Sequence, residues 1–77
     1  MNYKEQKRKA AEKVETLCKV IRSDSESTPK ELERLADKAR SAINAYEYVD
    51  IFTEGEAAAY RERVKEAYHV NMALREN

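Results

Sequence analysis

Residues 28–57 decide the fold and read TPKELERLADKARSAINAYEYVDIFTEGEA. This stretch contains two helix starts of the same kind. In Thr28-Pro29-Lys30-Glu31, the threonine hydroxyl can accept a hydrogen bond from the Glu31 amide, and the glutamate can reach back to the threonine amide. Thr53-Glu54-Gly55-Glu56 repeats this spacing, and Phe52 before it can pack on Ala57. The stretch therefore predicts a helix over 29–50, a short turn, and a second helix that starts at 54.

Apolar residues recur at helical steps of three and four on both sides of this turn. The seam of the helix over 29–50 is formed by Leu32, Leu35, Ala39, Ala42, Tyr46 and Val49. The seam of the helix over 54–75 is formed by Ala57, Tyr60, Val64, Ala67, Asn71 and Leu74. An earlier helix over 3–22 carries Ala10, Val14, Leu17 and Ile21, widened by Ala11 and Cys18. Because short connections force neighbouring helices to be antiparallel, we predict an all-α, up-down-up three-helix bundle in a single domain, 1–77.

The composition excludes several classes of protein. The 77 residues include 15 basic and 15 acidic side chains, with one Gly, one Pro, one Cys and one His. A lone Cys cannot form a disulfide framework and favours a reducing compartment, so we expect a cytoplasmic protein. No uncharged stretch approaches the ~20 apolar residues that cross a bilayer, so no membrane partner is expected. The polar, lysine-rich start of the chain does not read as a signal peptide.

The residues that could carry chemistry are few. Cys18 is expected to be buried and His69 exposed, which leaves a nucleophile without a base. Glu62, Glu66 and His69 have the spacing of metal ligands on one helix, but the carboxylates of a partner helix are missing from the other seams. A phosphate-binding loop needs more than one glycine. We therefore expect no enzyme, with no catalytic residue, metal or cofactor site.

Residues 39–68 turn through Asp50-Ile51-Phe52-Thr53-Glu54-Gly55-Glu56-Ala57. This hairpin resembles the helix–turn–helix of SHOCT domains, which are short modules with an Ile–Thr–Glu–Glu-type turn. The resemblance covers about 30 of 77 residues and departs where that pattern has Gly after the acidic residue, because Ile51 follows Asp50 directly. It implies a module that is appended to other proteins and that takes part in oligomerisation.

The predicted core is thin, because five seam positions are alanine and only thirteen residues are Leu, Ile, Val or Phe. Small domains of this kind commonly gain stability from association. We therefore expect a small helical protein–protein interaction module of regulatory, accessory or inhibitor type, of the kind that phages and mobile elements encode. It would form a homodimer and bind a larger partner. Ile43 and Val70 are expected outside the seams, and the candidate partner-binding residues are Tyr48, Ile51, Phe52, Tyr68, Asn71 and Met72.

An alternative function is nucleic-acid binding or a role in transcription. Residues 1–22 carry a net charge of +4 against −5 in residues 23–56. A basic stripe beside the apolar residues of the first helix is formed by Lys4, Lys7, Arg8, Lys19 and Arg22. Such a stripe is a candidate phosphate-binding surface, but Glu15 interrupts it and the net charge of zero weakens long-range attraction to nucleic acid.

Overall fold

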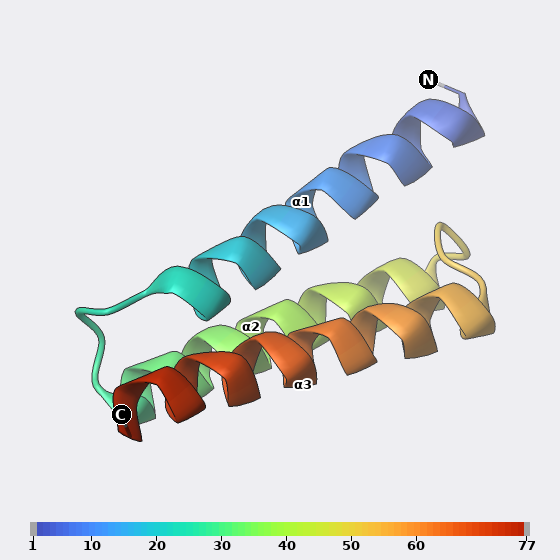
Figure 1. Ribbon diagram of the computed structural model, residues 1–77. Helices are drawn as coiled ribbons and strands as arrows, with labels where there is room; N and C mark the ends of the chain where they lie inside the picture. Colours follow the sequence, from blue (N-terminus) through green and yellow to red (C-terminus); the bar gives the residue numbers. More distant parts are fainter. Residues whose placement is uncertain (1, 77) are drawn as a thin grey trace.

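The computed structural model describes residues 2–76 and contains three helices, α1 (Tyr3–Ser23), α2 (Pro29–Tyr48) and α3 (Glu54–Glu76). Figure 1 shows α2 running back beside α1, and α3 returning beside α2. All three helix pairs are in contact, and α1 packs more closely against α3 than against α2. The molecule is a rod with extents of 44 × 19 × 15 Å. The predicted all-α three-helix bundle is confirmed.

Both predicted helix starts are confirmed as capping boxes. At the start of α2, the Glu31 amide donates to Thr28 Oγ1 at 3.1 Å, and the Thr28 amide donates to Glu31 Oε1 at 3.3 Å. At the start of α3, the Glu56 amide donates to Thr53 Oγ1 at 3.1 Å, and the Thr53 amide donates to Glu56 Oε1 at 2.8 Å. Each box satisfies two amides, which removes the main cost of beginning a helix at these positions.

The end of α2 lies at Tyr48, two residues before the predicted end. Asp50 has a φ of 61°, in the left-handed region. The Ile51 amide donates to the Tyr46 carbonyl at 2.9 Å, and the Asp50 amide donates to the Glu47 carbonyl at 3.0 Å. This pair of bonds is a Schellman motif. The helix therefore closes its own end with backbone bonds, and Asp50 occupies a position that usually holds glycine.

The buried face of α2 is rotated about the helix axis relative to the predicted seam. Leu32 and Ala39 are buried as expected, but Ala36 and Ile43 complete the buried face. Ile43 is fully buried, so the prediction that it lies outside the seam is wrong. A helix in a three-helix bundle contacts two neighbours, so its buried arc is wider than the two-position seam of a coiled coil. The predicted seam residues Leu35, Ala42 and Tyr46 are half-buried, and Val49 is 58% exposed.

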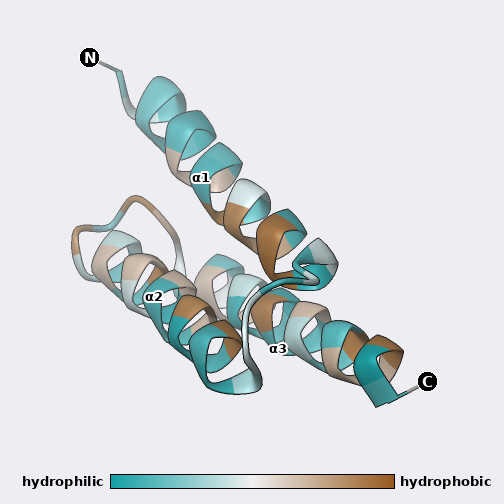
Figure 2. Cartoon of the chain, turned by 90° about the vertical axis from the view of Figure 1, so that its left-hand side faces the viewer, coloured by the Kyte–Doolittle hydropathy of each residue, from teal (hydrophilic) through white to brown (hydrophobic). Residues whose placement is uncertain are grey.

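The other two helices follow their predicted faces more closely. In α1 the buried residues are Ala10, Val14, Cys18 and Ile21, and Leu17 is half-buried. Figure 2 shows that α1 is hydrophilic over its first turns and becomes hydrophobic towards its C-terminal half. In α3 the buried residues are Ala57, Val64, Ala67 and Asn71. Leu74 is 65% exposed, contrary to the prediction, because the last turn of α3 presents Arg75 instead to the loop between α1 and α2.

An aromatic cluster closes the bundle beneath the α2–α3 turn. Phe52 is 2% exposed. Its ring stacks on Tyr60 with a centroid separation of 4.8 Å and meets Tyr46 edge-on at 5.4 Å. Phe52 is therefore a core residue, which corrects the expectation that it contacts a partner. The burial of this ring fixes the turn above it.

Candidate functional site

The strongest candidate site is an apolar surface at the α2–α3 end of the rod, which we call the turn-end patch. Tyr48 is 88% exposed and Val49 58% exposed. Ile51 is half-buried, and its carbonyl accepts a hydrogen bond from the Tyr3 hydroxyl at 3.3 Å. Tyr3, on the first turn of α1, is itself 51% exposed. We group Tyr3, Tyr48, Val49 and Ile51 under this name; they come from α1, from the last residue of α2 and from the turn.

An ion pair holds the first turns of α1 against the start of α3 beside this patch. The Lys7 ammonium donates to Glu56 Oε1 at 2.7 Å and lies 5.1 Å from the centre of the Tyr3 ring. The hydrogen bond to Glu56 raises the pKa of Lys7. The same bond, with that from the Thr53 amide, lowers the pKa of Glu56. The carboxylate that caps α3 therefore also anchors α1, which keeps Tyr3 beside the turn.

The structure does not bring the six predicted partner-binding residues together. Tyr48 and Ile51 belong to the turn-end patch, whereas Phe52 is buried beneath it. Residues 68–72 lie on α3 roughly 25 Å further along the helix, at a rise of about 1.5 Å per residue. There Tyr68 and Met72 are half-buried. The six candidate residues are therefore divided between the turn and the C-terminal half of α3.

Asn71 is 3% exposed and closes the C-terminal end of α1. Its Nδ2 group donates to the carbonyls of Ile21 at 2.7 Å, Arg22 at 3.2 Å and Asp24 at 2.7 Å. These carbonyls lie at a helix end, where intrahelical partners are missing. The sequence marked Asn71 as a polar residue in an apolar seam, but its partner is this chain's own backbone. The expectation that Asn71 contacts a partner is thus corrected, because its amide group caps α1 within the chain.

Arg75 extends this cap to the loop between α1 and α2, and the sequence analysis missed it. Its Nε donates to Asn71 Oδ1 at 2.6 Å, its Nη2 donates to the Asp24 carbonyl at 2.9 Å, and its Nη1 donates to the Ser27 carbonyl. We call Asn71 and Arg75, with the loop 24–27 that they bind, the latch. A charged residue near a helix C-terminus is so common that no pattern distinguished Arg75 from a solvated side chain.

The carboxylate of Asp24 organises the loop within the latch. Asp24 Oδ1 accepts from the amides of Glu26 at 2.9 Å and Ser27 at 3.0 Å, and Oδ2 accepts from the Ser27 hydroxyl at 2.5 Å. These bonds, first the one from the Ser27 hydroxyl, lower the pKa of Asp24. The loop thus presents its carbonyls to α3 in a fixed arrangement.

The basic stripe of the alternative function is partly neutralised. Lys7 is bound to Glu56, and the Arg8 guanidinium lies 2.5 Å from carboxylate oxygens of both Glu5 and Glu12. The expected interruption is present, because Glu15 pairs with Arg63 of α3 at 3.4 Å. The remaining stripe residues Lys4, Lys19 and Arg22 are exposed. Lys7 and Arg8 are therefore paired with carboxylates, whereas Lys4 near the start of α1 and Lys19 and Arg22 near its end are exposed without an ion pair among the described residues.

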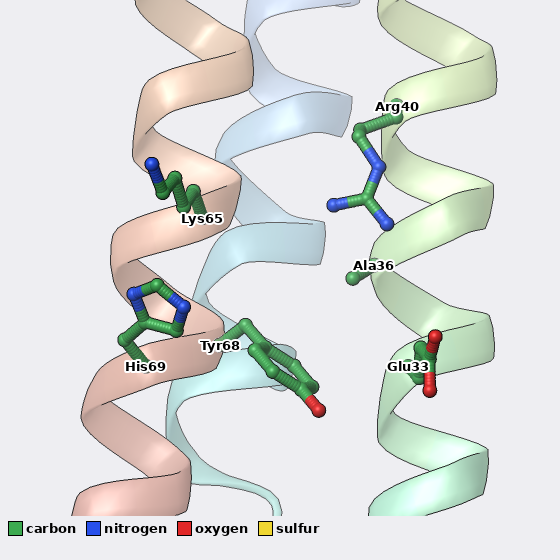
Figure 3. A pocket seen from close by; sticks show the side chains of 6 residues that line it. All are labelled: Glu33, Ala36, Arg40, Lys65, Tyr68 and His69. Carbon is green, nitrogen blue, oxygen red and sulfur yellow. The ribbon is translucent and has the colours of Figure 1, made fainter.

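The two side chains considered for nucleophilic chemistry lie in different seams. Cys18, 8% exposed, faces a hollow between α1 and α3, and its burial raises the pKa of the thiol. His69 is exposed beside a groove of ≈260 Å³ between α2 and α3, where Figure 3 shows Lys65 next to it and Arg40 opposite. Arg40 is paired with Asp37 of its own helix. This groove carries charges of both signs around a small alanine floor, and Cys18 lies in the other hollow, away from the histidine.

Residues 2–76 hold no group of three or more His, Cys, Asp or Glu side chains placed to bind a metal ion. Within the same residues, no helix combines the length and apolar character needed to span a membrane.

Comparison of the chain with protein-family models, curated proteins and solved structures gives no match. The resemblance of the hairpin to SHOCT domains therefore rests on its turn residues alone.

Proposed function

We propose that this chain is a small helical protein–protein interaction module that binds a larger protein partner, and associates weakly with itself, through the turn-end patch. The observation that carries the proposal is the exposure of Tyr48, 88%, at the end of α2 beside a turn whose backbone is fixed. Tyrosine combines a large apolar area with a polar tip and is enriched in the contact surfaces of proteins. A rigid turn adds little ordering cost when it is bound.

The size of the patch favours a larger partner over a tight homodimer. The end of the rod measures about 19 by 15 Å. Its projected area is therefore a few hundred Å², whereas a standard stable interface takes about 800 Å² from each partner. Two copies that meet end to end would form a weak, concentration-dependent dimer. A larger protein with a concave site could cover the patch and the adjoining sides of the helices.

Sedimentation equilibrium tests the self-association. We expect the wild-type chain to have an apparent mass of 9.0 kDa at high dilution and a larger mass as its concentration rises. Tyr48→Ser should restore the monomer at all concentrations. Leu74→Ser is the matched control, because Leu74 is 65% exposed at the opposite end of the rod and should leave the association unchanged. Equal effects of both variants would contradict a specific role for the turn-end patch.

The nucleic-acid alternative predicts strong retention on a heparin column at low salt. The neutralisation of Lys7 and Arg8 argues against it, because these two cations already have carboxylate partners. We expect early elution of the chain. Retention that disappears in a Lys19→Glu, Arg22→Glu variant would instead support a phosphate-binding surface near the end of α1.

A further inference from the structure

The three seams between the helices are closed in different ways. The α1–α3 seam contains the ion pairs Lys7–Glu56 at 2.7 Å and Glu15–Arg63 at 3.4 Å. In the α2–α3 seam, Arg61 bridges to Glu47 at 3.0 Å. Among residues 2–76, no ion pair or side-chain hydrogen bond joins α1 to α2. The α1–α2 seam is therefore held by apolar contacts.

The outer side of this seam carries partly exposed apolar side chains, and we call it the α1–α2 face. On α2, the side that faces α3 is marked by Arg40 and Glu47, so helical periodicity places Leu35 and Ala42 on the opposite side, towards α1. The same argument on α1 places Leu17 and Val20 towards α2, because Glu15 marks the side towards α3. The apolar residues of the face are Leu17, Val20, Leu35, Ala42 and Tyr46. All are half-buried except Val20, which is 43% exposed.

Basic side chains border this apolar strip on both helices. The bordering cations are Lys9 and Lys13 on α1 and Arg34 and Lys38 on α2, all four exposed and none in an ion pair among the described residues. The nearest acidic side chain on this side of α2 is Glu31, whose carboxylate accepts from the Thr28 amide. A hollow of ≈340 Å³ opens beside Leu35, with Arg34 and Lys38 in its walls together with Glu31 and Ser27. The face thus combines an apolar floor with positive edges.

We propose that the α1–α2 face binds an amphipathic helix of a partner protein, with acidic residues on both sides of the apolar stripe of that helix. A helix laid along the seam would complete a four-helix arrangement and cover the apolar strip. Glutamate or aspartate on its flanks would pair with the four free cations. A helix of about 20 residues, roughly 30 Å long, matches the lengths of α1 and α2. A second copy laid face to face would bring the positive edges together, so charge argues against it.

This inference rests on the proposed role as an interaction module but uses a surface other than the turn-end patch. The probes are two synthetic peptides of about three heptads, with leucine at the a and d positions. One carries glutamate at the e and g positions, and the other carries lysine there. Fluorescence anisotropy measures the binding of each peptide to the full chain. The Glu-flanked peptide should bind roughly tenfold or more tightly than the Lys-flanked peptide, and added salt should reduce this difference.

Charge reversal on the face gives the decisive comparison. Lys13→Glu with Lys38→Glu should abolish the preference between the two peptides, because it leaves two cations and two anions along the face. Lys19→Glu with Lys65→Glu changes the net charge equally on exposed residues of α1 and α3 outside the face and should preserve the preference. Because all four residues are exposed, both variants should fold. Tyr48→Ser should leave peptide binding unchanged, which separates this test from that of the turn-end patch.

Three results would overturn the proposal. The first is equal binding, or no binding, of the two peptides to the wild-type chain. The second is loss of peptide binding in Tyr48→Ser, which would locate the peptide at the turn end and leave the proposed function in place. The third is a wild-type dimer whose stability changes with Lys13→Glu and Lys38→Glu, which would put a second copy on the α1–α2 face.

Discussion

The two ends of the rod close their helices by different means. At the latch, α1 is capped from outside, because Asn71 and Arg75 of α3 bind the carbonyls at its end and in the following loop. At the turn end, α2 is capped by its own backbone through the Schellman motif at Asp50 and Ile51. The first arrangement uses polar side chains to connect helices that are distant in sequence. The Schellman motif at the turn end is made by backbone hydrogen bonds and needs no side chain.

This difference explains why the turn end can present an apolar surface. Since the backbone closes α2, the side chains of Tyr48 and Val49 are free to face solvent. Phe52, below the turn, supplies the packing that holds it in place. A helix end that is capped locally can therefore display residues for binding, whereas an end that is capped by another helix uses its side chains for stability.

The largest predicted effect is a difference in unfolding free energy between replacing a buried and replacing an exposed aromatic residue at the turn end. Phe52→Ala should cost about 3–5 kcal/mol of unfolding free energy, because it removes a ring packed between two tyrosines. Tyr48→Ala should change the stability of the monomer by less than about 0.5 kcal/mol. Urea melts at a dilution that keeps the chain monomeric measure both. Similar losses for the two variants would mean that the turn end is not divided into a core and a display surface.

The next effect tests the latch. Asn71→Ala should cost about 2–3 kcal/mol, because it leaves the buried Ile21 carbonyl without its side-chain donor and removes the acceptor of the Arg75 Nε group. Asn71→Asp should cost more, since a carboxylate would face three carbonyl oxygens. Asn44→Ala is the control on an exposed asparagine whose side chain, among residues 2–76, bonds to Arg61 alone, and we expect a loss below about 0.5 kcal/mol. Equal losses of unfolding free energy for Asn71→Ala and Asn44→Ala would mean that the hydrogen bonds of Asn71 do not stabilise the end of α1.

A smaller effect, of opposite sign, concerns the left-handed residue of the turn. Asp50→Gly should stabilise the chain by roughly 0.5–1 kcal/mol, because glycine adopts a positive φ without the steric cost of a Cβ atom. Ser41→Gly, at an exposed position inside α2, should destabilise by a similar amount because glycine is a poor helix former. Thermal melts distinguish the two signs. Destabilisation by Asp50→Gly would mean that the aspartate side chain, not the backbone, closes α2.

The smallest effect concerns pH at the latch. Because the pKa of Asp24 is lowered in the folded chain, its contribution to stability is present above the ordinary carboxyl pKa of about 4 and is lost as the pH falls below it. The difference in unfolding free energy between wild type and Asp24→Asn should therefore shrink as the pH falls from about 5 to about 3, because a carboxyl group becomes protonated over this range. Urea melts across this range measure it. A constant difference would show that the loop does not depend on the charge of Asp24.

The sequence predicted the parts of the fold that depend on local patterns. Thr28 and Thr53 marked the helix starts correctly because a capping box is contained within four residues. The end of α2 was predicted two residues too late. The residues Val49-Asp50 carry no sequence signal that Asp50 adopts a positive φ, which the structure shows. Ile43 was misplaced because a heptad template describes one neighbour, whereas α2 has two.

The candidate site was predictable in part. Tyr48 and Ile51 were expected at a surface and lie in the turn-end patch, since residues beside a capped turn have few positions in which to be buried. Phe52 was assigned to the same surface, but as the residue before a helix cap it folds under the turn. The bonds from Asn71 and Arg75 join residues about 50 positions apart, and pairings of that separation depend on the tertiary arrangement of the helices.

The most direct test of the interaction role is a dilution series followed by amide NMR spectra. Dilution should shift the resonances of residues 46–53 and of Tyr3 as the contact at the turn end dissociates. The resonances of the latch, residues 21–27 and 71–75, should stay in place. Shifts that are absent, or that are spread evenly over the three helices, would contradict an interaction surface at the turn end.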